Sequence, residues 1–177
     1  MCRQSFSLYR VKIINKVGKA VEKDEVGELY SRSPFLFGGY WGMPEETNTS
    51  LKDGWFSAGD MARFDEEGYV YLVDRKTDLI ISGGVNIFPR DIEEVLHAHP
   101  EVLEAAAVGV EDAYWGEKVK AFVVTRSDAK LTEKILSSYC DGKLAAYKIP
   151  KEFVFIDALP RNAAGKVLRR SLRSLVD

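Results

Sequence analysis

The pattern in which apolar and polar residues follow one another changes near residues 74–78, and this change limits the folds that the chain can adopt. Before it, apolar and polar residues alternate in short runs, and the stretch 60–75 predicts a β-hairpin with a turn at Asp65-Glu66-Glu67-Gly68. After it, apolar strands interleave with helical patterns. We therefore expect a β-rich part over residues 1–75 and a compact α+β part over residues 76–177.

The α+β part is expected to contain three helices that pack on its strands. The first helix is predicted from Pro89, with Pro100 ending it, and the second at about residues 132–145. On the second helix, the residues expected on one face are Ile135, Leu136, Tyr139 and Leu144. The closing helix is predicted over residues 167–175, with Arg169, Arg170 and Arg173 on a solvated polar side. The strands before residue 75 are too few to close a core alone.

The composition excludes several classes of protein. No apolar run approaches the ~20 residues that cross a bilayer, so we expect no transmembrane segment. The formal net charge of −2 argues against a nucleic-acid partner. The two cysteines, Cys2 and Cys140, fit neither a zinc site nor a disulfide framework, and the first ten residues lack the apolar segment of a signal peptide. These observations predict a reducing, cytoplasmic location.

The motif LPRNAAGKVLRR at residues 159–170 places a lysine after a glycine, as phosphate-binding loops do. Such a loop needs GxxxxGK followed by Ser or Thr. Pro160, which has no N–H group, and Val167, which cannot bind magnesium, stand at two of the required positions. Two interpretations remain open. Lys166 either lies on a flexible loop before a basic helix, or delivers a positive charge to a phosphate and an acyl oxygen.

Two further motifs contain candidate binding residues. Asp60 ends DGWFSAGD at residues 53–60, where its carboxylate can accept hydrogen bonds from both hydroxyls of a ribose or can cap a turn. Arg75 ends the strand expected to pair with the strand that begins at Asp60, so the two side chains can approach one diol or form a surface ion pair of little energy. Gly83 and Gly84 permit close approach of a ligand to the backbone, although a plain tight turn has the same pattern.

The sequence indicates no metal site. His97 and His99 stand at i and i+2 on a predicted helix, where side chains diverge. We expect His97 to be exposed and His99 to be partly packed, with no catalytic function for either.

Five motifs in a fixed order resemble the C-terminal part of the adenylate-forming enzymes. This superfamily contains the acyl-CoA synthetases, the adenylation domains of non-ribosomal peptide synthetases and firefly luciferase. The motifs are VGELYSRSPFLFGGYWGMPEET, DGWFSAGD, GYVYLVDRKTDLIISGGVNIFPRDIEEVL, HPEVLEAAAVGV and YKIPKEFVFIDALPRNAAGKVLRR. They cover nearly the whole chain, and LIISGGVNIFPRDIEEVL is most similar to the fatty-acid and aryl acyl-CoA ligases.

The resemblance implies a function for each candidate residue by its place in these motifs. It implies that Asp60 binds the ribose hydroxyls of ATP, with Arg75 beside it. Lys166 matches the lysine that contacts the α-phosphate and the substrate carboxylate during adenylation. Gly83 and Gly84 match the loop that lines the pantetheine tunnel during thioester formation.

The resemblance also implies a division of the parent enzyme. Residues 76–177 would form the small α+β lid, and residues 1–75 the last strands, a partial β-barrel, of a large adenylation domain. Thr77 would occupy the hinge position, where the family commonly has Asp or Lys. The phosphate loop, the adenine-binding strand and the acyl pocket are expected in a long preceding segment, together with the ligands of Mg²⁺.

We therefore expect the C-terminal portion of an ATP-dependent acyl-CoA synthetase of the kind used in fatty acid metabolism, inactive alone. Its partners would be the missing N-terminal adenylation domain, a carboxylic acid and CoA, with ATP and AMP as nucleotides. Two alternatives stay open, namely half of a split ligase and a non-catalytic binding module that keeps the lid fold. Lys143, Lys148 and Lys151 either meet CoA phosphates or form a solvated face.

Overall fold

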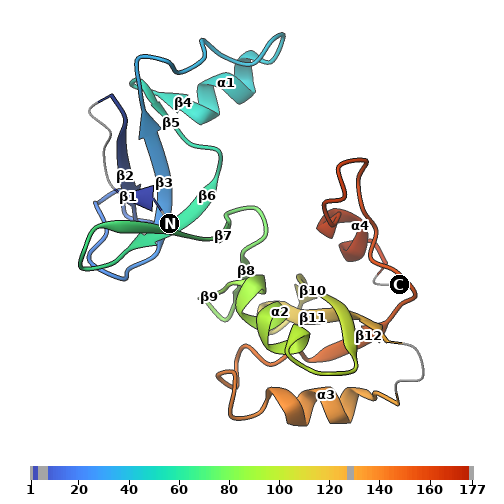
Figure 1. Ribbon diagram of the computed structural model, residues 1–177. Coiled ribbons are helices and arrows are strands. Elements are labelled where there is room, and N and C mark those ends of the chain that lie inside the picture. Colours follow the sequence, from blue (N-terminus) through green and yellow to red (C-terminus); the bar gives the residue numbers. More distant parts are fainter. Residues whose placement is uncertain (1, 4–7, 127–129, 176–177) are drawn as a thin grey trace. The chain divides into compact units, whose positions relative to one another are not determined.

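The computed structural model describes residues 2–3, 8–126 and 130–175 of the chain (Figure 1). The chain forms two compact units, Met1–Thr77 and Asp78–Asp177. Each unit combines a mainly antiparallel sheet with at least one short helix, so the α+β class predicted from the sequence is confirmed. Both sheets are open rather than closed barrels in the part of the chain that the structure describes. The domain boundary predicted after residue 75 concerns a longer parent enzyme and stays a prediction.

The first unit, which we call the β unit, is a seven-stranded sheet in the order β1-β7-β6-β3-β5-β4, with β2 also paired to β3. Its only described helix, α1, begins at a proline followed by two glutamates, residues that favour the first turn of a helix. The bounds are β1 (Cys2–Arg3), β2 (Arg10–Ile14), β3 (Gly27–Arg32), α1 (Pro44–Ser50), β4 (Leu51–Lys52), β5 (Trp55–Phe56), β6 (Asp60–Phe64) and β7 (Tyr69–Arg75). The predicted hairpin is therefore β6–β7.

The core of the β unit is small. Its buried apolar cluster contains Ile13, Val21 and Ala62, and a few half-buried residues pack against them. Large apolar side chains are instead exposed on this unit, and they include Leu8, Tyr9, Phe35, Phe37, Tyr40, Trp41 and Met43. Trp41 is fully exposed. Most of the aromatic surface of this unit therefore lies outside its core.

The second unit, which we call the α+β unit, contains a five-stranded sheet in the order β10-β11-β8-β9, with β12 parallel to β11. Its elements are β8 (Ile80–Ser82), β9 (Val85–Ile87), α2 (Pro89–His97), β10 (Val102–Asp112), β11 (Gly116–Thr125), α3 (Glu133–Cys140), β12 (Glu152–Phe155) and α4 (Arg169–Arg173). Helix α3 ends before the predicted residue 145 because Asp141 has extended backbone angles. The closing helix is likewise shorter than the predicted 167–175.

Both faces of this sheet are covered by apolar side chains. Successive residues of a strand point to opposite faces, so a strand buried on both sides reads as a continuous apolar run, as β10 does. On one face, Ala105 and Ala107 pack against α2 and α3, with Leu96 and Leu136 in the same cluster. On the other face, the cluster contains Ala106, Val108, Phe122, Leu159 and Leu172, and the last of these belongs to α4.

One predicted helix face is wrong in part. Leu136 and Cys140 are the buried residues of α3, whereas Ile135 is 44% exposed. The thiol of Cys140 is free, and burial raises its pKa. The predicted state of Cys2 lies outside what the structure describes. No helix in the described ranges is both long enough and apolar enough to span a bilayer.

Helix α2 also covers the outer edge of β10. The N–H group of Ala105 donates to Nε2 of His97 at 2.8 Å, and that of Ala107 donates to a carboxylate oxygen of Glu93 at 2.9 Å. The predicted exposure of His97 and packing of His99 are confirmed, since His99 is buried with its ring 4.6 Å from that of Tyr139. His97 and Glu93 thus each satisfy one backbone donor that a sheet edge would otherwise leave unpaired.

Candidate functional site

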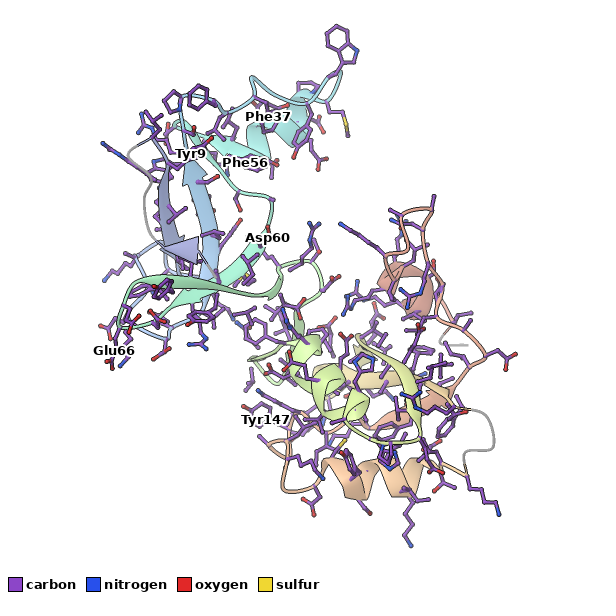
Figure 2. The ribbon with its side chains drawn as sticks, in the orientation of Figure 1. Tyr9, Phe37, Phe56, Asp60, Glu66 and Tyr147 are labelled. Atoms are coloured by element: carbon purple, nitrogen blue, oxygen red, sulfur yellow. The ribbon has the colours of Figure 1, made fainter. Side chains whose placement is uncertain are left out.

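Asp60 and Arg75 lie directly opposite each other at one end of the β6–β7 hairpin, as the sequence predicts. Asp60, the first residue of β6, is labelled in Figure 2. Nε of Arg75 is 3.5 Å from Oδ1 of Asp60. The side chains are 57% and 32% exposed, respectively. An ion pair this exposed contributes little to stability. The carboxylate therefore keeps acceptor sites that face solvent, and a diol can donate to them.

Glu28 anchors the backbone on both sides of this pair. Its carboxylate accepts hydrogen bonds from Oγ of Ser57 at 2.7 Å and from Nζ of Lys76 at 2.8 Å. Burial alone raises the pKa of Glu28, but the hydrogen bonds from Lys76 and Ser57 outweigh it and hold the pKa below its usual range. The pKa of Lys76 is raised by the same hydrogen bond. Sequence analysis did not identify this network. The one indication in the sequence was a glutamate within strand β3, among residues that alternate between apolar and polar.

Gly83 and Gly84 form the two-residue turn between β8 and β9, with φ angles of 56° and 80°. Two positive φ angles are typical of the tightest hairpin turns, which favour glycine. Gly83 meets a second constraint, because a Cβ atom there would lie 2.8 Å from the ring of Trp115. Its N–H group also donates to the carbonyl of Trp115 at 2.8 Å. The tight-turn interpretation is therefore confirmed, while the function at a ligand stays a prediction.

Lys166 follows the tip of a hydrogen-bonded hairpin and not the flexible loop that the sequence suggested. The side chain of Asn162 accepts from the N–H groups of Ala164 and Lys166, and the N–H of Asn162 donates to the carbonyl of Lys166. Gly165 has a φ of 78°, which closes the turn. The Asn-Ala-Ala-Gly tip is thus fixed by its own polar groups.

The ammonium group of Lys166 is available to a ligand. The residue is exposed, and no carboxylate among the described residues forms an ion pair with it. Arg169 differs from the solvated arginine that we expected, because Glu93 accepts two hydrogen bonds from its Nη2 at 2.7 and 2.8 Å. The two candidate turns of the α+β unit, at Gly83 and at Lys166, are not joined by any hydrogen bond between described residues.

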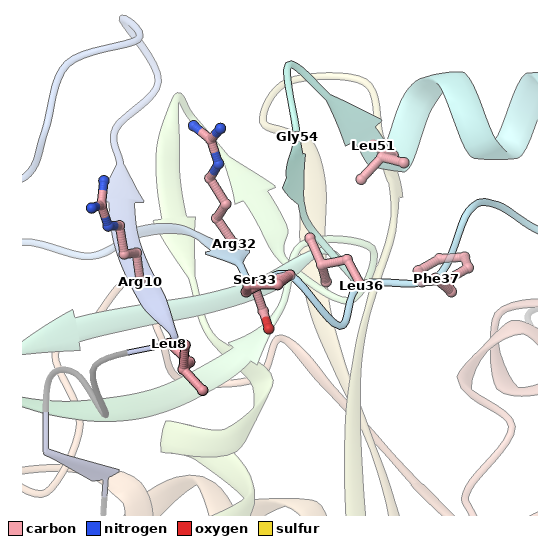
Figure 3. Close-up of a pocket in the computed structure, with 9 residues that line it drawn as sticks. Leu8, Arg10, Arg32, Ser33, Leu36, Phe37, Leu51 and Gly54 are labelled. Atoms are coloured by element: carbon pink, nitrogen blue, oxygen red, sulfur yellow. The ribbon is translucent and has the colours of Figure 1, made fainter.

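Two cavities lie away from these residues. A cavity of about 590 Å³ in the β unit is lined by Arg10 and Arg32, which are cross-strand neighbours, and by apolar residues that include Leu36 and Phe37 (Figure 3). A second one, of about 430 Å³, lies between α2 and α3.

Two of the lysines that we expected to meet CoA phosphates or to form a solvated face line the cavity between α2 and α3. Nζ of Lys148 is 2.6 Å from a carboxylate oxygen of Asp91, and Lys143 stacks on the ring of Tyr139. The described residues contain no group of three His, Cys, Asp or Glu side chains able to hold a metal ion.

Comparisons with known proteins match nearly the whole chain. A model of the AMP-binding enzyme C-terminal domain matches residues 91–166. The 2-succinylbenzoate–CoA ligase of Bacillus mycoides (strain KBAB4) is 46% identical over 164 residues, which are 93% of this chain and 34% of the ligase. The long-chain-fatty-acid–CoA ligase of Bacillus subtilis (strain 168) is 46% identical over 157 residues, or 89% and 28% of the two chains.

A solved structure adds a three-dimensional match. The o-succinylbenzoate CoA synthetase of Bacillus subtilis, in complex with the acyl-adenylate intermediate OSB-AMP, superimposes with a TM-score of 0.87 at 39% identity. The match covers 94% of this chain and 34% of the synthetase. This chain therefore spans about a third of the length of the relatives that it matches.

Proposed function

The chain belongs to the adenylate-forming enzymes, whose C-terminal portion it matches, and we propose that it supplies the lid and the nucleotide contacts of an ATP-dependent acyl-CoA ligase. In the first step of the proposed reaction, a carboxylate oxygen attacks the α-phosphorus of ATP, and pyrophosphate leaves. In the second step, the thiol of CoA loses its proton and attacks the acyl carbon, and AMP leaves. The same acid is thus activated and then transferred without any redox change.

Lys166 is the proposed catalytic residue, and the observation that carries the proposal is its exposed ammonium, which directly follows the tip of an ordered hairpin and forms no ion pair with a described residue. Adenylation brings a carboxylate against a negatively charged triphosphate, and negative charge on the α-phosphate grows in the transition state. A lysine held in place stabilises that charge without having to reorganise. An ammonium already paired with a carboxylate would have to break that pair first.

Asp60 and Arg75 are proposed to bind the ribose of ATP. Asp60 accepts hydrogen bonds from the two hydroxyl groups, and Arg75, whose Nε lies 3.5 Å from Oδ1 of Asp60, orients the carboxylate. The network of Glu28 supports this arrangement because it fixes Lys76, which follows Arg75 directly. The Mg²⁺ that accompanies ATP would be held by groups outside this chain.

Gly83 and Gly84 are proposed to line the path of the pantetheine arm of CoA. A turn without side chains lets a narrow chain pass close to the backbone. We also propose that Thr77, next to the division between the two units, is the hinge about which the α+β unit turns between the two steps. ATP and CoA are cytoplasmic metabolites, which supports a cytoplasmic location.

The exposed apolar residues of the β unit support the proposal that this unit belongs to a larger domain. Phe37 contacts the rings of Tyr40 and Phe56, with centroids 5.0 and 5.1 Å away, and Trp41 next to them is fully exposed. Patches of this kind mark surfaces that another part of a protein covers. The preceding adenylation domain of the relatives would cover it, either in one polypeptide or as the second chain of a split ligase.

The test compares the two half-reactions in a ligase that joins this chain to an adenylation domain. For Lys166→Ala we expect a loss of at least about 100-fold in ATP–pyrophosphate exchange, as for removal of other transition-state charge contacts. Thioester formation from supplied acyl-adenylate should change no more than a few-fold. Lys134→Ala, on the exposed side of α3, is the matched control.

Three outcomes would contradict the proposal. Equal loss in both half-reactions would show that Lys166 is not specific to adenylation. No loss in either would favour the non-catalytic module. Turnover of ATP, acid and CoA by this chain alone would show that it needs no separate adenylation domain.

A further inference from the structure

We propose that Arg161 is a positioning residue, which holds the peptide group of Lys166 in place by bridging it to Glu104. The inference rests on the proposed function of Lys166, but the contacts that carry it are independent of that function. Arg161 itself is not proposed to touch ATP or the acid. It acts through the hairpin that carries the lysine.

The guanidinium group of Arg161 binds two acceptors at once. Its Nη1 donates to the carbonyl oxygen of Gly165 at 2.6 Å, and its Nη2 donates to a carboxylate oxygen of Glu104 at 2.7 Å. The carbonyl of Gly165 and the N–H of Lys166 belong to one planar peptide group. That N–H donates to the side chain of Asn162 at 2.9 Å. Both polar ends of the peptide group are therefore held.

A β-bulge places Glu104 where Arg161 can reach it. The pairing of β10 with β11 shifts register between Val102 and Glu104, so that Leu103 is an extra residue and is 51% exposed. Beyond the bulge, Glu104 alternates with Ala105 and shares its face with Ala106. Ala106 belongs to the apolar cluster that also contains Leu159 and Leu172. Glu104 thus lies on the sheet face that the hairpin segment crosses.

The base of the hairpin is held without Arg161. Leu159 and Leu172 are buried in that cluster, and Val167 packs against it. The N–H of Leu168 also donates to the carbonyl of Pro160 at 2.8 Å. Loss of the Arg161 side chain should therefore loosen the Gly165–Lys166 peptide group, which keeps its hydrogen bond to Asn162, and leave the fold of the unit intact.

The exposure of the pair argues for a function in positioning rather than in stability. The side chains of Arg161 and Glu104 are 42% and 34% exposed. Ion pairs so exposed contribute little to folding. A displacement of a catalytic group by about 1 Å, in contrast, can lower a rate by about 100-fold. The pair is thus expected to matter for adenylation far more than for unfolding.

The kinetic test uses the joined ligase described above. We expect Arg161→Ala to lower kcat for adenylation by about 10- to 100-fold while KM for ATP stays within about threefold, because the geometry and not the binding is lost. Arg161→Lys should recover part of the rate, since one ammonium can reach either acceptor but does not have the two-pronged shape of the guanidinium. Glu104→Gln should resemble the lysine variant.

The double variant and a control complete the kinetic test. Lys166→Ala combined with Arg161→Ala should be no slower than Lys166→Ala alone, because Arg161 acts only through Lys166. Arg126→Ala is the matched control, since Arg126 also donates to a backbone carbonyl, that of Pro100, at 3.0 Å. Thioester formation from supplied acyl-adenylate should be unchanged in Arg161→Ala.

A second measurement does not depend on activity. In this chain alone, amide hydrogen exchange at Lys166 should become faster in Arg161→Ala, whereas exchange at Leu172 and the unfolding midpoint should not change. If Lys166→Ala abolishes adenylation and Arg161→Ala leaves it within threefold, the inference is wrong and the proposed function stands. If Lys166→Ala has no effect, the proposed function fails, and the exchange rates still decide whether Arg161 holds the tip.

Discussion

The two units bury their apolar residues to very different extents. In the α+β unit, helices cover one face of the sheet and the segment from Leu159 to Leu172 covers the other. In the β unit, the buried cluster contains Ile13, Val21 and Ala62, while larger side chains such as Trp41 remain exposed. The difference teaches that the α+β unit has the core of an independent domain, whereas the β unit relies on a surface that lies outside it.

The largest effect is expected on the stability of the α+β unit, when a substitution creates a cavity in its core. Leu96→Ala removes a fully buried side chain and should lower the free energy of unfolding of that unit by about 2–5 kcal/mol. Hydrogen exchange resolved by peptide would show the loss in residues 78–175 only. The exposed Leu103 is the control, because Leu103→Ala should change stability by less than about 0.5 kcal/mol. An equal loss in the β unit would show that the two units unfold as one.

An intermediate effect is expected at the β8–β9 turn. Gly83→Ala places a Cβ 2.8 Å from the ring of Trp115 at a positive φ, so it meets both a clash and a backbone penalty of roughly 1–2 kcal/mol. Gly84→Ala meets the backbone penalty alone, because nothing lies near its Cβ position. Urea unfolding of both variants should therefore rank Gly83→Ala as the less stable. The opposite order would contradict the contact with Trp115.

The smallest effect on stability is expected from two aspartates in turns, Asp65 in the β unit and Asp112 in the α+β unit. Asp112 accepts hydrogen bonds from the N–H groups of Trp115 and Tyr114, which lower its pKa. Around Asp65, burial raises the pKa, but hydrogen bonds from Tyr71 and from backbone groups outweigh it and lower the pKa below 3.8.

A lowered pKa in the folded state means that each contribution is present above the unfolded pKa and is lost as the pH falls through the folded value. In an NMR titration, the side-chain carboxyl resonances of Asp65 and Asp112 should thus titrate below pH 3.8. The stability difference between Asp112→Ala and the unmodified chain should shrink as the solution is acidified through that range. A titration of Asp112 at or above pH 3.8 would contradict the two turn hydrogen bonds.

Local features of the fold could be predicted from the sequence, and contacts across long stretches of chain could not. The β6–β7 hairpin and the Gly83-Gly84 turn depend on neighbouring residues, so periodicity and turn chemistry were sufficient. Arg161 and Glu104 are 57 positions apart, and the one-residue bulge at Leu103 decides whether they share a face. No pattern in a single sequence predicts such a shift in strand register.

The candidate site shows the same limit. The pairing of Asp60 with Arg75 followed from the hairpin, which the sequence indicated. The support from Glu28 did not, because it joins strand β3 to Lys76, 48 positions away. The hairpin at Lys166 was mistaken for a flexible loop because small residues suggest mobility, whereas the amide of Asn162 orders them.

The hydrogen bonds that His97 and Glu93 accept from the edge of β10 have a consequence for self-association at high protein concentration. A bare strand at the edge of a sheet can recruit a strand from another molecule, and chains then join in ladders. Two outward N–H groups of β10 are already engaged by side chains of α2, so an approaching strand would find no donor at either position. Replacing His97 or Glu93 by alanine would reopen that edge and favour self-association, even though neither residue lies in a catalytic position.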